Sequence, residues 1–93
     1  MSTSLVTSAA IDAALRTHLA PIELQVRDDS EAHRGHAGHS GSGGSHFGVR
    51  IRSPRFAGLN RVARHRLVYD ALAALMSQGI HALAIDARAP GEA

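Results

Sequence analysis

The spacing of apolar residues changes several times along this chain, and each change marks a new element. Near the start, Ile11, Leu15 and Leu19 recur at every fourth position, which is the spacing of one helix face. This pattern predicts a helix from Thr7 to Leu19. Pro21 cannot continue a helix, so the element ends before it.

Three later segments alternate or cluster their apolar residues as strands do. Residues 22–28 alternate strictly between apolar and polar, which predicts a half-buried strand from Ile22 to Asp28. The same pattern predicts a second strand from His46 to Ser53, and Ile80 to Ala87 is predicted as a third.

A long helix is predicted between the second and third strands. Asn60 is a suitable N-cap residue and Gly79 a suitable residue just beyond the C-terminus. Its expected buried stripe consists of Val62, His65, Val68, Tyr69, Leu72, Leu75 and Met76.

These elements follow the order αββαβ and predict an α+β fold of two layers. The second and third strands flank a helix, so they should be parallel, while the first strand pairs antiparallel with the second. The result is a three-stranded mixed sheet with both helices on one face. We expect a single domain over residues 1–93, with a flexible loop rich in His and Gly at residues 29–45 and tails at residues 1–6 and 88–93.

Composition restricts the chemistry that this domain can perform. The 93 residues include no Cys, so the chain forms no disulfide and offers no thiolate ligand. It lacks a basic start followed by an apolar run, so we expect no signal peptide, no membrane span and a cytoplasmic location. No constellation of nucleophile and base is evident, and we expect neither enzymatic activity nor a small-molecule substrate.

Histidines gather at one predicted edge of the sheet. The first strand ends where the second and third begin, so residues at these three chain ends should be neighbours. His33, His36 and His39 lie on the loop, His46 opens the second strand and His81 opens the third. Neutral imidazoles are good metal ligands, and the alternative is a polar loop that happens to be rich in histidine. His65 and His18, in the two helices, are interpreted as structural.

Arginine supplies all ten basic residues, and six of them lie in residues 50–66, which contain no Asp or Glu. The net charge of the chain is only +2, so the positive charge is local. Arg61, Arg64 and Arg66 fall in the first two turns of the long helix, where the helix dipole disfavours cations. Phosphate or an acidic partner would compensate them; the alternative is that Asp70 pairs with Arg66 and water screens the others.

Four segments of the chain resemble the BolA family. Together they extend through most of residues 11–90 and include the strings SxxH, SHF, RHR and IHAL in the order typical of that family. The segments are LQVRDDSEAHRGHAG (24–38), SHFGVRIRSPRFAG (45–58), VARHRLVYDAL (62–72) and GIHALAI (79–85).

The resemblance implies a class II KH-like fold without a functional GxxG loop, in agreement with the order of elements. It also implies a monothiol glutaredoxin as partner and a shared [2Fe-2S] cluster, whose thiolates come from the glutaredoxin and from glutathione. On this chain the implied ligands are His81 and a loop histidine, His33 or His36. Such proteins act in iron-sulfur trafficking or iron homeostasis.

Two other functions stay open. Some members of the family are transcription regulators that bind DNA, and the matching residues here are Arg55, Arg61, Arg64 and Arg66. A simple metal buffer formed by His33, His36 and His39 is the third interpretation.

Overall fold

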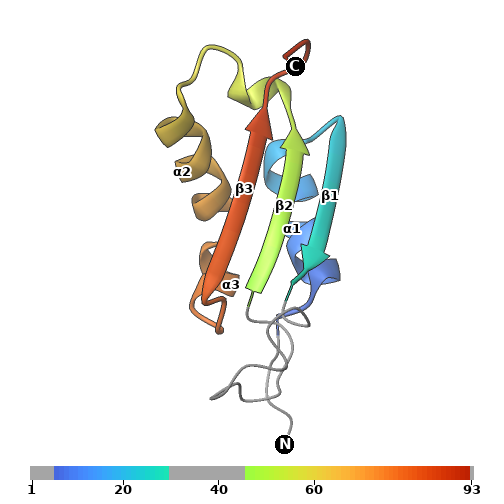
Figure 1. Cartoon of the computed structure of the whole chain (residues 1–93), viewed down its shortest axis with the longest axis vertical. Coiled ribbons are helices and arrows are strands. Elements are labelled where there is room, and N and C mark those ends of the chain that lie inside the picture. The colour runs from blue at the N-terminus through green and yellow to red at the C-terminus, as the bar shows by residue number, and fades with distance from the viewer. Residues whose placement is uncertain (1–5, 30–45, 93) are drawn as a thin grey trace, which may run out of the picture.

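The computed structural model describes residues 6–29 and 46–92 (Figure 1). Its elements follow the predicted order, with the long helix divided in two. They are α1 (Ser8–Leu19), β1 (Glu23–Asp28), β2 (His46–Arg52), the 3-10 turn η2 (Pro54–Phe56), α2 (Arg61–Ala71), α3 (Ala73–Met76) and β3 (Ala82–Arg88).

The first helix forms as its sequence predicts. The hydroxyl of Thr7 caps α1 by accepting a hydrogen bond from the amide of Ala10 at 3.1 Å. Ile11, Leu15 and Leu19 are all buried, and they place one face of the helix on the sheet. Ala20 then adopts a left-handed conformation with φ of 45°, which turns the chain into β1.

The sheet has the predicted topology, with β2 in the centre. β1 runs antiparallel to β2, with Asp28 opposite Phe47, and β3 runs parallel to β2, with Ala82 opposite His46. The end of β1 and the starts of β2 and β3 therefore share one edge, which we call the histidine edge (Figure 1).

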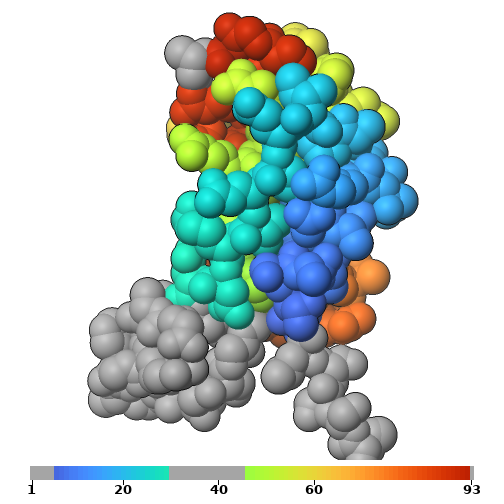
Figure 2. Space-filling view, turned by 90° about the vertical axis from the view of Figure 1, so that its right-hand side faces the viewer, coloured from blue at the N-terminus to red at the C-terminus, as the bar shows by residue number. Residues whose placement is uncertain are grey.

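Both helices cover the same face of the sheet and leave the other face open. Seen from the side of β1 and α1, the two layers lie side by side, with the sheet on the left and the helices on the right (Figure 2). Phe47, Val49 and Ile51 are buried between the layers, whereas Arg50 points to the open face and is exposed. The α+β fold of two layers is thus confirmed.

The predicted long helix is wrong in two respects. It is interrupted at Leu72, which has φ of −103° and ψ of 12° and separates α2 from α3. Two members of the expected buried stripe also face solvent: Val62 is 66% exposed and Tyr69 is 40% exposed. Arg64, whose side chain is only 13% exposed, lies on the inward face instead.

The contacts of Arg64 agree with the orientation of α2, whose Val68 and Leu72 are buried on the same side. The Arg64 guanidinium donates to the carbonyl oxygens of Leu59 and Ala87, at 2.8 and 3.2 Å, and to both carboxylate oxygens of Glu92, at 2.5 and 2.7 Å. These acceptors lie near the end of β3, so α2 must turn Arg64 toward the sheet. Of the expected stripe, Val68 and Leu72 are buried and Leu75 and Met76 pack against the core, so only its first part is wrong. Arg64 takes the inward position there, and an apolar pattern does not reveal a buried arginine.

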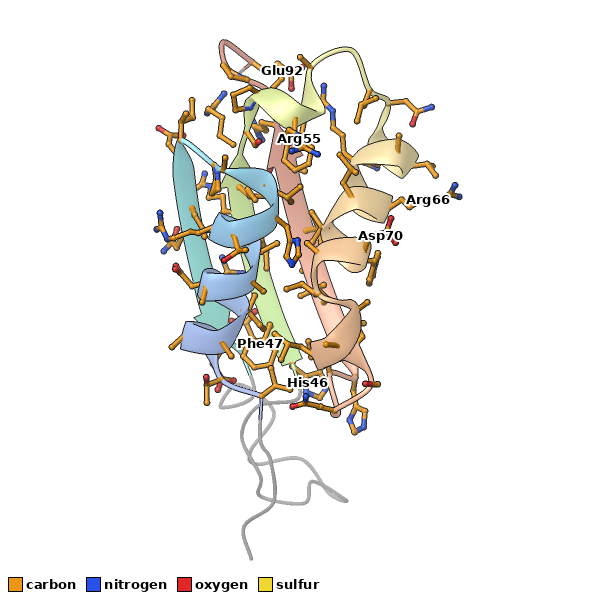
Figure 3. The ribbon with its side chains drawn as sticks, turned by 180° about the vertical axis from the view of Figure 1, so that it is seen from behind. His46, Phe47, Arg55, Arg66, Asp70 and Glu92 are labelled. Atoms are coloured by element: carbon orange, nitrogen blue, oxygen red, sulfur yellow. The ribbon has the colours of Figure 1, made fainter. Side chains whose placement is uncertain are left out.

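The tail expected at residues 88–93 is instead held against the domain over residues 88–92. Ala89 is buried, and the Arg52 guanidinium donates to the carbonyl oxygens of Ala89 and Glu92, at 3.0 and 2.7 Å. The Glu92 carboxylate also accepts from the Ala89 amide at 2.9 Å. We call this set of contacts from Arg52 and Arg64 the arginine clamp; Glu92 is labelled in Figure 3.

The arginine clamp changes the acidity of Glu92. Hydrogen bonds from Arg64 and from the Ala89 amide lower the pKa of Glu92 from 4.5 to about 2. The same carboxylate raises the pKa of Arg64. A carboxyl group whose pKa is lower in the folded state stabilises the fold above its unfolded pKa, and this contribution is lost as the pH falls toward the folded value.

Ser53 joins α1 to the sheet from a fully buried position. Its hydroxyl donates to the carbonyl oxygen of Leu19 at 2.6 Å and accepts from the Arg55 amide at 3.1 Å. One hydroxyl therefore provides a hydrogen-bond partner for a carbonyl oxygen at the end of α1 and for an amide in η2.

We expect Ser53→Ala to lower the free energy of unfolding by about 1–3 kcal/mol, because it leaves a buried carbonyl and an amide without a partner. Urea unfolding followed by far-UV circular dichroism measures this loss. Ser77→Ala is the matched control, since it removes an exposed hydrogen bond to Ala74. Equal losses in the two variants would contradict the assigned role of Ser53.

We also expect Glu92→Gln to unfold at a lower temperature than wild type at pH 6, with the difference shrinking as the pH falls from about 4.5 to about 2. Thermal unfolding at a series of pH values measures the difference. Asp12→Asn, which removes the carboxylate of an exposed ion pair on α1, controls for the loss of one negative charge. A difference that stays constant down to pH 2 would show that the arginine clamp does not lower the pKa of Glu92.

Candidate functional site

The histidine edge brings two imidazoles together from strands that are distant in sequence. His46 opens β2, and His81 directly precedes Ala82, the residue that lies opposite His46 in the parallel register. The two rings meet edge to face, with centroids 6.3 Å apart and planes inclined by 75°. His81 is exposed and His46 is half-buried. Figure 3 shows His46 at the start of its strand, at one end of the domain.

The separation of the rings is close to what a shared metal ion requires. Two imidazoles on one tetrahedral ion, each about 2.0–2.1 Å from the metal, have ring centroids about 5 Å apart. The observed 6.3 Å is wider by an amount that side-chain rotation can close. Two imidazoles do not complete a site, and within residues 6–29 and 46–92 no group of three or more potential ligands could hold a metal.

The loop histidines of the sequence analysis, His33, His36 and His39, lie outside the described residues. The strands that flank this segment are described, and both meet at the histidine edge. The amide of Asp29 donates to the carbonyl oxygen of His46 at 2.7 Å, and Asp28 lies opposite Phe47. The two ends of the segment between them are therefore fixed beside His46.

Sequence reasoning missed a cation on the open face beside this edge. Arg27 of β1 lies opposite Gly48 of β2, and its guanidinium lies so close over Gly48 that a Cβ at this position would collide with it. Arg27 also forms an ion pair with Asp29 at 3.4 Å. The signal in the sequence is a glycine at an outward position of the central strand, where a larger residue would be expected.

The remaining histidines lie away from this edge, in the two long helices. His18 is exposed on α1, and His65 is half-buried on α2. Arg64, the neighbour of His65, contacts residues at the end of β3, and six steps of about 3.3 Å along a strand separate that end from the histidine edge by about 20 Å. His65 is thus not placed to share a metal with His81.

The four candidate arginines divide into two groups. Arg64 belongs to the arginine clamp, so its charge is already compensated by Glu92. Arg55, Arg61 and Arg66 are exposed, and in residues 6–29 and 46–92 none of them forms an ion pair. The predicted pair of Arg66 with Asp70 does not form; Figure 3 shows Arg66 directed away from the domain.

These exposed arginines lie around the start of α2. Ser53 caps η2, which carries Arg55, and the side chain of Asn60 caps α2 by accepting from the Ala63 amide at 2.9 Å. The cap of α2 matches the prediction.

The helices of the structure are short. Within the two described ranges, none is long and apolar enough to cross a membrane.

Comparison with known proteins identifies related sequences and structures. The sequence profile of the family described as BolA-like protein matches residues 15–92. The chain is 44% identical over 80 residues to Protein BOLA1, chloroplastic, from Arabidopsis thaliana, an alignment that covers 84% of this chain and 50% of that protein. It therefore spans about half the length of this relative.

A second relative and a solved structure agree with this result. The chain is 44% identical over 75 residues to the DNA-binding transcriptional regulator BolA of Vibrio cholerae, covering 81% of this chain and 67% of that protein. The BolA domain of SufE1 from Arabidopsis thaliana superposes with a TM-score of 0.81 and 42% identity, over 92% of this chain and 94% of that domain.

Proposed function

Since the chain belongs to the BolA-like family, we propose that it is a non-enzymatic adaptor that pairs with a monothiol glutaredoxin and supplies histidine ligands to a shared [2Fe-2S] cluster. In this role it would act in iron-sulfur trafficking or iron regulation. The observation that carries the proposal is the exposed imidazole of His81 beside His46, at the edge where β1 ends and β2 begins.

His81 is the first ligand in this proposal, because the start of β3 fixes its backbone and its ring is exposed. The second ligand is His33 or His36, whose segment begins and ends at the same edge. His46 packs edge-on against His81 and so limits the directions in which His81 can point. A ligand on a rigid element holds its geometry better than one on a loop.

The absence of Cys makes the partner obligatory for such a cluster. This chain can supply only nitrogen ligands, so the thiolates must come from the glutaredoxin and from its bound glutathione. Histidine in place of thiolate raises the reduction potential of a [2Fe-2S] centre, as in Rieske centres.

The cytoplasmic location expected from the sequence stays a prediction. The name of one Arabidopsis relative places that protein in the chloroplast, and a location does not transfer between family members.

We expect His81→Ala to change the visible circular dichroism of the mixed cluster, formed by combining the chain with a monothiol glutaredoxin, glutathione, iron and sulfide. Loss of one ligand should return the cluster to the glutaredoxin alone. Single variants of His33, His36 and His46, measured in the same way, identify the second ligand.

His18→Ala is the control, because it removes an exposed imidazole from α1. A wild-type spectrum for His81→Ala would remove this residue from the ligands. Metal uptake that survives His81→Ala and disappears when His33, His36 and His39 are replaced together would indicate a metal buffer instead.

DNA binding is the second candidate function. The name of the Vibrio cholerae relative describes that protein as DNA-binding, and Arg55, Arg61 and Arg66 are exposed here without an ion pair in the described part of the chain. Arg64 is a weaker candidate for DNA binding, because its guanidinium is already bound to the Glu92 carboxylate.

If DNA binds through these residues, the affinity for a duplex of about 20 base pairs should fall steeply with salt, and Arg55→Ala, Arg61→Ala and Arg66→Ala should each reduce the slope by about 0.9. Fluorescence anisotropy at several salt concentrations measures both quantities. Arg16→Ala, on α1, is the control. Absence of binding at about 50 mM salt would exclude this function.

A further inference from the structure

The outer surface of α2 carries apolar and positively charged side chains on one face. Val62, His65, Arg66 and Tyr69 follow the spacing i, i+3, i+4 and i+7, which aligns them along a helix. Together with Arg61 they line a shallow hollow of about 440 Å³. We call these five residues the α2 face.

The apolar residues of the α2 face leave apolar surface exposed to solvent. Val62 is 66% exposed and Tyr69 is 40% exposed, and they are two of the three large exposed apolar residues in the described part of the chain. Single exposed apolar residues are common on protein surfaces, but two that line one hollow form a patch. This patch points outward because the opposite face of α2, with Arg64 in the arginine clamp and Val68 and Leu72 in the core, packs on the sheet.

The two arginines of the α2 face are not neutralised by ion pairs with other described residues. Arg61 and Arg66 form no ion pair there, and Arg66 points away from the domain (Figure 3). Both lie in the first two turns of α2, where the helix dipole disfavours a cation and favours an anion. An incoming negative group would therefore relieve an unfavourable local arrangement.

We infer that the α2 face is a docking surface for an acidic segment of another protein, which places one aliphatic or aromatic side chain between Val62 and Tyr69 and carboxylates against Arg61 and Arg66. A hydrophobic centre with a charged border is the usual composition of a protein interface. Duplex DNA would use the two arginines, but its phosphates offer nothing for Val62 and Tyr69 to contact.

This inference goes beyond the cluster function, because the α2 face is distinct from the histidine edge. The first turn of α2, which carries Arg61, lies near the end of β3, about 20 Å along the strands from His46 and His81, and Tyr69 lies about 12 Å nearer to them. A glutaredoxin at the histidine edge and an acidic client around the start of α2 would therefore contact different elements of the domain. The chain would then connect a cluster partner to a second protein.

Three synthetic peptides of about 14 residues, or about four helical turns, test the inference. The first combines Leu at every third or fourth position with Glu between them, the second replaces each Glu with Gln, and the third replaces each Leu with Ser. Amide chemical shifts of the full chain, recorded with up to about 1 mM peptide, report affinity and position together.

We expect the first peptide to shift amides of α2 and to bind at least about 10-fold more tightly than the other two. Arg61→Glu and Arg66→Glu should each weaken it about 10-fold, and Val62→Ser and Tyr69→Ser about 5-fold. Arg50→Glu is the matched control, because it reverses an exposed arginine on the open face of the sheet. Since all four replaced residues are exposed, the variants should retain the wild-type far-UV spectrum.

Three results would overturn the inference. The first is the absence of shifts in α2 with the Leu and Glu peptide, and the second is equal weakening by Arg50→Glu. The third is binding of duplex DNA that is lost with Arg61→Glu but unchanged in Val62→Ser and Tyr69→Ser, which would assign the surface to nucleic acid. None of these results depends on cluster formation, so the inference and the proposed function fail separately.

Discussion

The central position of β2 determines where every other feature of this domain lies. Because β2 is antiparallel to β1 and parallel to β3, one edge of the sheet receives the end of the first strand and the starts of the other two. His46 and His81 meet only for this reason, since they are far apart in the chain. At the opposite edge the same pairing brings together the ends of β2 and β3, where the arginine clamp forms.

Polar contacts of Ser53, Arg52 and Arg64 hold segments of the chain that the small apolar core does not hold by itself. The core consists mainly of aliphatic residues, and two phenylalanines, Phe47 and Phe56, are its largest members. Ser53 attaches α1 to the start of η2, and Arg52 and Arg64 hold the chain after β3. Long arginine stems can cover apolar surface while their guanidinium groups reach carbonyl oxygens at the sheet edge. The orientation of α2 combines both kinds of contact, with Val68 in the core and Arg64 in the arginine clamp.

The sequence predicts the strands, the topology and the helix caps because each depends on local patterns. Alternation along β1 and β2, the Asn60 cap and the parallel crossover all follow from neighbours in the chain. The inward face of α2 was predicted in part, since Val68 and Leu72 of the expected stripe are buried. The inward position of Arg64 was not predicted, because its partner Glu92 is distant in sequence.

The part of the candidate site that depends on strand topology could be predicted from the sequence. The expectation that the three chain ends share an edge is confirmed, and it places His46 beside His81. Arg27 over Gly48 was not foreseen, because the sequence shows a glycine in a strand but not which side chain lies over it. The two edges of the sheet are about 20 Å apart, more than twice the Debye length of about 8 Å at physiological salt. A charge beside Arg61, in the first turn of α2, is therefore largely screened from the imidazoles. α2 runs back toward the histidine edge, so Arg66 lies about 8 Å nearer, and its charge is the one through which a partner on the α2 face can act on the imidazoles.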